Sequence, residues 1–139
     1  FAGTGQVGIE AISRGAAEVV FVDNARAAIH TVRDNLAHTQ LGEWARVVQA
    51  DAMTFLRGAG ERPFDIIYVA PPQYLGMWVE ALQAIDMAAG RLLVDGGLAI
   101  IQIDPREFES LELANLVLTD KRRYGNTLLG FYQYADVGD

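Results

Sequence analysis

Three glycines near the start of the chain stand where a backbone could wrap closely around a ligand. Gly3, Gly5 and Gly8 form a G-x-G-x-x-G pattern. Glycine lets the chain turn sharply, and a helix beginning directly after Gly5 would point unpaired N–H groups at the ligand. The next predicted strand ends on Asp23, 20 residues after Gly3, where an acid can bind the two hydroxyls of a ribose. The stretch predicts a nucleotide-like cofactor, and the alternative is a plain glycine turn.

An acid also follows the next strand that the sequence predicts. Asp51 comes directly after an apolar stretch at 47–50. In a parallel sheet, ligands bind outside the carboxyl ends of the strands, so this carboxylate could accept a hydrogen bond from an adenine amino group. Aspartate is equally suited to cap a helix that begins at Ala52. The sequence leaves both roles open.

A double proline follows the near-continuous apolar stretch at 64–69, which is typical of a strand buried on both faces. Pro71 and Pro72 remove two N–H donors and hold the backbone in an extended arc. Carbonyl groups exposed by such an arc can accept hydrogen bonds from an exocyclic amine on a base. A rigid loop without a chemical role is the alternative.

Composition limits the class of protein. The 139 residues are 51% hydrophobic and 21% charged, which indicates a single globular domain with its own core. The absence of cysteine excludes disulfides, thiolate zinc sites and a cysteine nucleophile, and we expect a reducing, cytoplasmic compartment. We expect neither a signal peptide nor a membrane span. The net charge of −7 argues against a broad nucleic-acid surface, so any such partner would have to be bound locally.

Alternating patterns predict a doubly wound, mostly parallel α/β sheet that ends in an antiparallel hairpin about Gly125-Asn126. Gly96-Gly97 should form the turn into the strand at 98–103. Because a glycine loop of this kind follows a strand, Phe1 should lie at the end of a first strand that the chain lacks. The predicted helices are 6–14, 25–39, 52–57 and 77–88, and the predicted strands are 18–23, 47–50, 64–69, 98–103, 116–124 and 127–134.

Other chemical patterns are absent or weak. Ile9-Glu10 stand where a phosphate-binding P-loop requires Lys-Ser/Thr. His30 and His38 lack metal-ligand spacing. We expect both to be exposed on a helix, without an acidic partner, and we expect no metal site. The run 121–123, Lys-Arg-Arg, is either a solvated strand end or a phosphate contact.

Taken together, these residues resemble the RsmD family, bacterial methyltransferases that modify the N2 amine of a guanine in small-subunit ribosomal RNA with S-adenosylmethionine. Residues 1–16 resemble the cofactor motif of the family and 121–127 its final hairpin. The resemblance implies that the binding partner is ribosomal RNA or the small ribosomal subunit. It implies cofactor contacts at Phe1, Gly3, Thr4, Gly5, Gly8, Asp23, Asn24, Asp51 and Ala52, and catalytic contacts at Pro71, Pro72, Gln73 and Tyr74.

The chain departs from the family at the catalytic loop. The family pattern is Asp-Pro-Pro followed by Tyr or Phe, whereas this chain has Ala70 before the prolines and Gln73 after them. The carboxylate would accept a hydrogen bond from the target amine and the aromatic ring would stack on the base. The sequence therefore leaves open a non-catalytic cofactor-binding or ribosome-associated protein, and a methyltransferase acting on adenine or on protein. A nicotinamide dehydrogenase is the most distant alternative.

Overall fold

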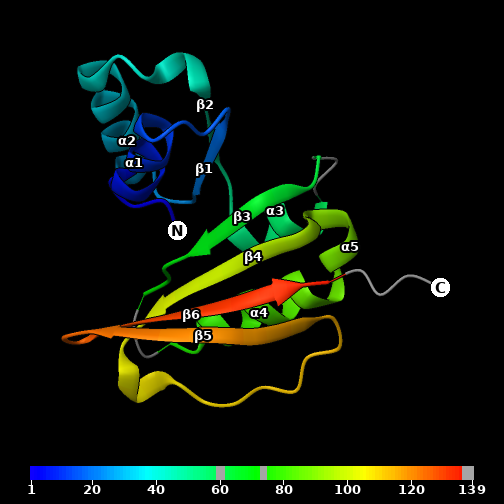
Figure 1. Ribbon diagram of the computed structural model, residues 1–139. Coiled ribbons are helices and arrows are strands. Elements are labelled where there is room, and N and C mark those ends of the chain that lie inside the picture. Colours follow the sequence, from blue (N-terminus) through cyan, green and yellow to red (C-terminus); the bar gives the residue numbers. More distant parts are fainter. Residues whose placement is uncertain (59–61, 73–74, 136–139) are drawn as a thin grey trace. The chain divides into compact units, whose positions relative to one another are not determined.

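The computed structural model describes residues 1–58, 62–72 and 75–135. These residues form two compact units, Phe1–Phe55 and Leu56–Asp139, which we call the N-terminal and the C-terminal unit (Figure 1). Each has its own sheet and its own helices, so each is described by itself.

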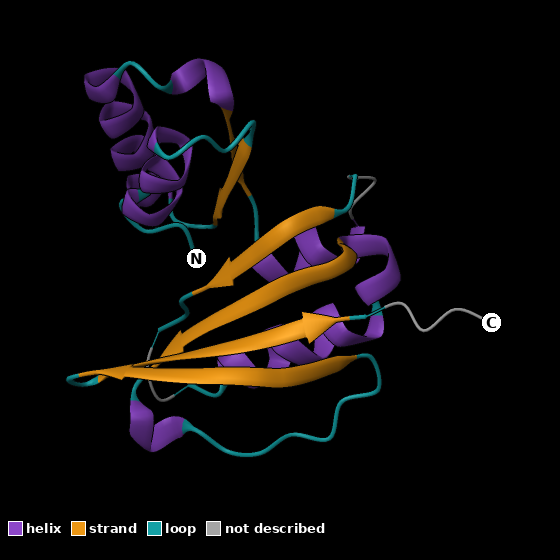
Figure 2. Ribbon diagram, in the orientation of Figure 1, coloured by secondary structure: helices purple, strands orange, loops and turns teal. Residues whose placement is uncertain are grey.

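The N-terminal unit contains a parallel pair of strands covered by two helices (Figure 2). The strands pair in register from Val19 opposite Ala45 to Asp23 opposite Gln49, so both end at the same edge. In chain order the elements are α1 (Gln6–Ser13), β1 (Val19–Asp23), α2 (Arg26–Thr39), a 3₁₀ turn η1 (Gly42–Trp44), β2 (Ala45–Gln49) and the start of α3 (Ala52–Gly58).

An apolar core joins α1 and α2 to β1. It is formed by the apolar positions of each helix that recur every three to four residues and by the inward-facing side chain of β1. Its buried members are Ile9, Ile12, Phe21, Val32 and Leu36.

Gly8 is the position where α1 packs most closely on this core. A Cβ atom added there would lie 2.6 Å from the ring carbon Cζ of Phe21 and 3.0 Å from Cγ1 of Val19. The Phe21 ring is buried and has little room to move. The third glycine of the pattern therefore serves close packing of the helix on the strand.

We expect Gly8→Val to lower the free energy of unfolding by roughly 2–3 kcal/mol, because overpacking a close-packed site forces neighbouring side chains out of position. Denaturant titration monitored by circular dichroism measures this. Gly42→Ala is the matched control, since no atom lies within 4 Å of a Cβ added there. Adding Phe21→Leu to Gly8→Val should recover part of the loss. Equal stability of Gly8→Val and the wild type would show that the contact is not tight.

The C-terminal unit is a four-stranded sheet with helices packed on one face (Figure 2). The strand order is β3-β4-β6-β5, in which β3 and β4 are parallel and the other pairs are antiparallel. The elements are β3 (Phe64–Val69), α4 (Met77–Met87), α5 (Ala89–Leu92), β4 (Leu93–Ile103), a 3₁₀ turn η2 (Pro105–Glu107), β5 (Leu116–Tyr124) and β6 (Thr127–Tyr134).

Two local expectations about this sheet are wrong. The strand predicted to begin at residue 98 begins at Leu93 instead. It passes through Gly96, which has a φ angle of +81° and lies where the register of the pairing with β3 shifts. The strand β3 is not buried on both faces, because it is the edge of the sheet and Ile66 is 55% exposed. Sequence patterns also missed α5 and both 3₁₀ turns, which are too short to show a period.

The broader expectations are confirmed. The chain is an α/β protein with parallel pairs and a C-terminal antiparallel hairpin, whose strands have the predicted bounds. No helix of the described residues is long and apolar enough to cross a membrane.

Candidate cofactor site and catalytic loop

The glycine loop has the backbone that its sequence predicts. Gly3 and Gly5 have φ angles of +59° and +79°, in the left-handed region that favours glycine. Gly5 precedes the first residue of α1, and no side chain caps this helix end. The first N–H groups of a helix have no partner within the helix, so this end can donate to a ligand.

Asp23 closes this loop from the end of β1. Its Oδ2 accepts a hydrogen bond from the N–H of Gly3 at 3.1 Å, and its Oδ1 accepts one from the N–H of Ala25 at 2.9 Å. Partial burial acts to raise the pKa of Asp23, but the N–H groups of Ala25 and Gly3 outweigh it, and the pKa lies below its ordinary value. Asp23 is thus ionised at neutral pH, and each carboxylate oxygen keeps a lone pair for a further donor.

Asp51 takes the capping role that the sequence left open. Its Oδ2 accepts hydrogen bonds from the backbone N–H of Thr54 at 3.0 Å and from the hydroxyl of Thr54 at 3.2 Å. Ala52, the first residue of α3, is half-buried. Since Ala50 donates its N–H to the carbonyl of Asp23 at 3.0 Å, the ends of β1 and β2 are held together.

The remaining predicted cofactor residues surround this edge of the N-terminal unit. The side-chain amide of Asn35 donates to the carbonyl of Thr4 at 2.8 Å, which ties the loop to α2. The amino group of Phe1 donates to the carbonyl of Val22 at 2.7 Å. Asn24 is exposed directly after β1. This unit therefore brings the predicted cofactor residues together, except that Gly8 packs on Phe21 instead of facing the edge.

The loop, the helix end and the acid suit a nucleoside cofactor that carries a carboxylate. A Cβ atom added at Gly3 would have no atom within 4 Å, so open space adjoins the loop beside Asp23. The carboxylate can accept ribose hydroxyls, and the N-terminus of α1 favours an anionic group. The residues present thus fit S-adenosylmethionine.

The predicted catalytic loop begins in the C-terminal unit, at the end of β3. Ala70 and Pro71 are half-buried and Pro72 is exposed. Gln73 and Tyr74 lie outside the described residues, so their predicted catalytic roles stay predictions.

A polar pair that sequence reasoning missed lies at the end of β3. The hydroxyl of Tyr68 donates a hydrogen bond to the side-chain oxygen of Gln102 on β4, and burial raises the pKa of Tyr68. This bond ties β3 to its neighbour two residues before Ala70. Both side chains sit in apolar strand patterns, and their pairing depends on the register between the strands.

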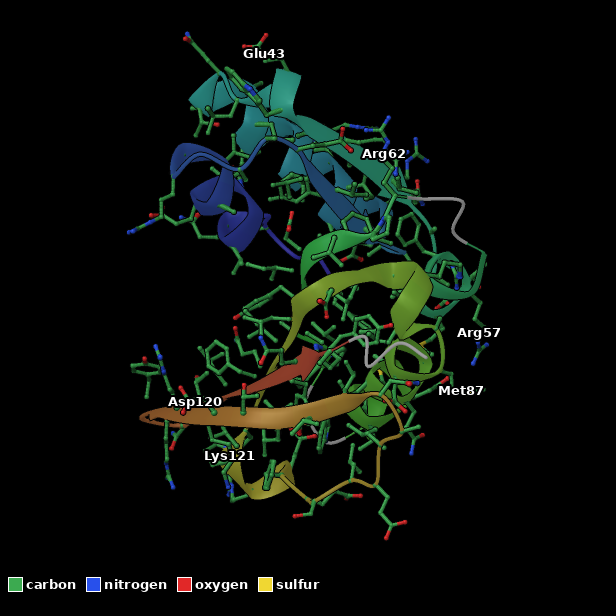
Figure 3. All side chains as sticks on the ribbon, turned by 45° about the vertical axis from the view of Figure 1, so that its right-hand side comes forward. Glu43, Arg57, Arg62, Met87, Asp120 and Lys121 are labelled. Atoms are coloured by element: carbon green, nitrogen blue, oxygen red, sulfur yellow. The ribbon has the colours of Figure 1, made fainter. Side chains whose placement is uncertain are left out.

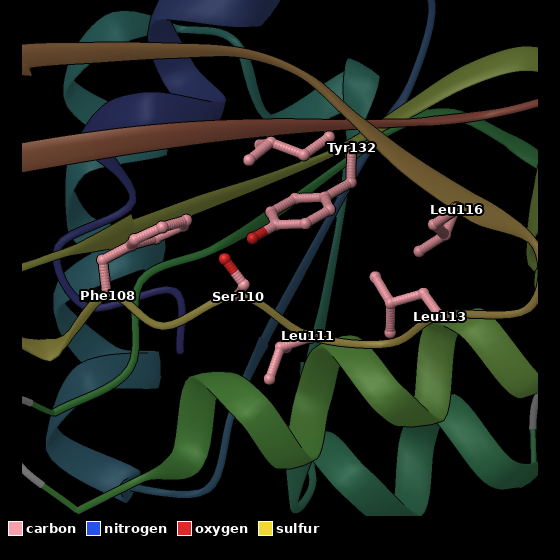
Figure 4. A pocket seen from close by; sticks show the side chains of 7 residues that line it. Phe108, Ser110, Leu111, Leu113, Leu116 and Tyr132 are labelled. Atoms are coloured by element: carbon pink, nitrogen blue, oxygen red, sulfur yellow. The ribbon is translucent and has the colours of Figure 1, made fainter.

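A small, mostly apolar cavity lies under the hairpin of the C-terminal unit. Its volume is about 160 Å³, and in Figure 4 the hydroxyls of Ser110 and Tyr132 point toward each other inside it. Burial raises the pKa of Tyr132. The other lining residues are Phe108, Leu111, Leu113, Leu116 and Leu118. The lining offers no charged group, so we assign this cavity to packing.

The described residues contain no group of three or more His, Cys, Asp or Glu side chains that could hold a metal ion. His30 and His38 are exposed on α2, as expected. The expectation that neither has an acidic partner is wrong, because Nε2 of His30 lies 3.3 Å from a carboxylate oxygen of Asp34 one helical turn later.

Residues 1–133 match the model of the protein family described as conserved hypothetical protein 95. The chain belongs to this family, the RsmD family of methyltransferases. It is 38% identical over 139 residues to "Ribosomal RNA small subunit methyltransferase D" of Escherichia coli strain K12, which covers 100% of this chain and 68% of that protein.

Solved structures share the fold of this chain. A conserved hypothetical protein of Streptococcus pyogenes has a TM-score of 0.85 and 26% identity, over 96% of this chain and 82% of its own. A ribosomal protein L11 methylase from Lactobacillus delbrueckii has a TM-score of 0.74 and 18% identity, over 97% of this chain and 67% of its own, which supports the methyltransferase fold alone. The predicted family and the predicted enzyme class are confirmed.

Proposed function

We propose that this methyltransferase transfers a methyl group from S-adenosylmethionine to the N2 amine of a guanine in small-subunit ribosomal RNA. The observation that carries the proposal is the 38% identity along the whole chain to an RNA methyltransferase of the small ribosomal subunit. We infer that the two units act as one catalytic domain, which the family match across both of them supports.

The N-terminal unit would hold the cofactor. Ionised Asp23 would accept hydrogen bonds from the ribose hydroxyls while its bonds to Gly3 and Ala25 keep it in place. The start of α1 would bind the cofactor's carboxylate. Asp51 already caps α3 through Oδ2, so an adenine contact would have to share its carboxylate with that role. When bound, the cofactor supplies an electrophilic methyl group on a sulfonium.

The target amine would be oriented by the loop that follows β3. Pro71 has no N–H to offer, and its carbonyl can accept a hydrogen bond from an exocyclic amine. Ala70 supplies no carboxylate, so the orientation has to come from backbone carbonyls and from Gln73. Positioning of the reacting groups, more than acid–base chemistry, would supply the rate.

We predict that Gln73→Ala slows methyl transfer by roughly tenfold, which corresponds to losing one positioning hydrogen bond of about 1–2 kcal/mol. Cofactor affinity should be nearly unchanged, because Asp23 and the glycine loop are untouched. Single-turnover methylation at saturating cofactor measures the rate, and isothermal titration calorimetry gives the affinity. A wild-type rate in Gln73→Ala would remove this residue from the site.

The second candidate is a cofactor-binding protein without catalytic activity, which Ala70 specifically favours. Mass spectrometry of nucleosides from ribosomal RNA incubated with the enzyme and cofactor separates the candidates. N2-methylguanosine is the expected product. N6-methyladenosine would show that the target base is adenine, and the absence of any methylated nucleoside would favour the second candidate.

A further inference from the structure

The tip of the β5–β6 hairpin lies at one end of the strands of its sheet. The predicted catalytic loop begins at the same end, after the last residue of β3. Arg123 on β5 pairs with Leu128 on β6, and Leu128 pairs with Ile103 at the carboxyl end of β4. β4 is parallel to β3, whose last residue, Val69, pairs with Ile101. The basic run on β5 therefore lies at the same end of the sheet as the double proline after β3, with β4 and β6 between them.

A polar groove opens at this tip. Its volume is about 450 Å³, and it is lined by Asp104, Pro105, Arg106, Arg123 and Asn126. Buried Asp104 accepts hydrogen bonds from the backbone N–H of Arg106 at 2.8 Å and from its guanidinium at 3.1 and 3.0 Å. These two charges offset each other, which leaves the positive charge of Arg123 to the groove.

The three basic residues of the run differ in what they contact. Arg122 forms an ion pair with Asp120 at 2.9 Å, and this hydrogen bond raises the pKa of its guanidinium. The ammonium of Lys121 lies 4.3 Å from the centre of the Phe108 ring, and Figure 3 shows Lys121 and Asp120 on opposite sides of β5.

Arg123 is the cation of the run that lines the groove. Its Nε donates to the carbonyl of Gly125 at 3.0 Å, a bond that fixes the side chain without removing its charge. Within the stretches that the structure describes, no carboxylate pairs with it. The guanidinium retains donors in a planar fork, the geometry that matches a phosphate.

We propose that this groove binds a phosphate of the RNA backbone, with Arg123 as the principal contact and the side-chain amide of Asn126 as a further donor. The proposal rests on the proposed function, which makes the substrate an RNA. A net charge of −7 leaves the protein dependent on local contacts of this kind. The neighbouring Tyr124 is 59% exposed and offers a ring on which an unpaired base can stack.

Salt-dependent binding tests the proposal. The probe is a fluorescein-labelled oligoribonucleotide of about 20 nucleotides and mixed sequence, followed by fluorescence anisotropy with the full chain. We expect Arg123→Gln to weaken binding roughly fivefold to tenfold at low salt and to reduce the slope of log K against log[salt] by about one, as for the loss of one phosphate contact. Thermal melting should match the wild type, because Arg123 is exposed.

Arg122→Gln is the matched control, since it removes the same charge from the adjacent position. The double variant Asp120→Asn/Arg122→Gln also removes the carboxylate left behind. We expect affinity within about twofold of the wild type for the double variant, with an unchanged salt slope. An unchanged slope in Arg123→Gln, or equal losses in Arg123→Gln and the double variant, would overturn the groove as a phosphate site.

The outcome is distinguishable from failure of the proposed function. Wild-type protein that binds the oligoribonucleotide through Arg123 but never methylates ribosomal RNA would refute the enzyme and support the groove. Wild-type protein that methylates ribosomal RNA while Arg123→Gln binds it equally well would refute the groove alone.

Discussion

Asp23→Ala should weaken binding of S-adenosylmethionine by about 1–3 kcal/mol, because ribose hydroxyls would lose a charged acceptor. The variant also removes the bonds from Gly3 and Ala25 that close the loop. Isothermal titration calorimetry with the full chain measures the loss.

Two variants separate charge from fold in this prediction. Asp34→Ala removes the same charge from an exposed position on α2 and should bind the cofactor as the wild type does. Asp23→Asn keeps the shape but turns one acceptor into a donor that meets a backbone N–H, so it should behave like Asp23→Ala. Unchanged affinity in both Asp23 variants would remove the residue from the site.

The pH dependence follows from the pKa of Asp23, which the N–H groups of Ala25 and Gly3 hold below its ordinary value. A depressed pKa contributes stability that is present above the unfolded value and is lost as pH falls through the folded value. Cofactor affinity should therefore show no titration of Asp23 between about pH 5 and pH 8. A step in that range that disappears in Asp23→Asn would contradict the assignment.

Asp86→Ala should destabilise the C-terminal unit by roughly 2–4 kcal/mol. Asp86 is buried on α4, and its carboxylate accepts N–H bonds from Ala114, Asn115 and Leu116 at 3.0, 2.8 and 2.9 Å. These bonds fix the chain where it enters β5. Alanine would leave three backbone donors without their acceptor. Equilibrium unfolding in urea measures the change.

The matched control for this prediction is Glu80→Ala, which removes an exposed acid from the same helix and should change stability by less than about 0.5 kcal/mol. Asp86→Asn should lie between the two. It keeps an oxygen for Asn115 and Leu116 but places an amide donor against the N–H of Ala114. Wild-type stability in Asp86→Ala would show that water replaces the carboxylate without cost.

Local sequence signals predicted the features that depend on local chemistry. The glycine pattern and the spacing to Asp23 were enough to predict the loop, because positive φ angles and the bond from Gly3 follow from residues close to the strand end. The final hairpin was predicted with its bounds, since alternation and Gly125-Asn126 define both strands and the turn.

Features that depend on long-range packing were not predictable. The role of Gly8 rests on where the Phe21 ring lies, and the bond between Tyr68 and Gln102 rests on the register of two strands. Asp86 looks like an ordinary polar position on a helix until the chain at 114–116 returns to it. The exposure of β3 followed from its place at the sheet edge, which its apolar sequence does not reveal.

The proposed function requires that the chain remains catalytic although alanine stands at position 70 of its loop. Single-turnover transfer of tritium from labelled S-adenosylmethionine to naked small-subunit ribosomal RNA and to intact small subunits tests this, at saturating cofactor and with a reaction that lacks the protein as the reference. We predict transfer by the wild type to at least one of the two substrates and none in the reference. Wild-type protein that binds cofactor with normal stoichiometry yet transfers label to neither substrate would contradict the claim and leave a cofactor-binding protein in its place.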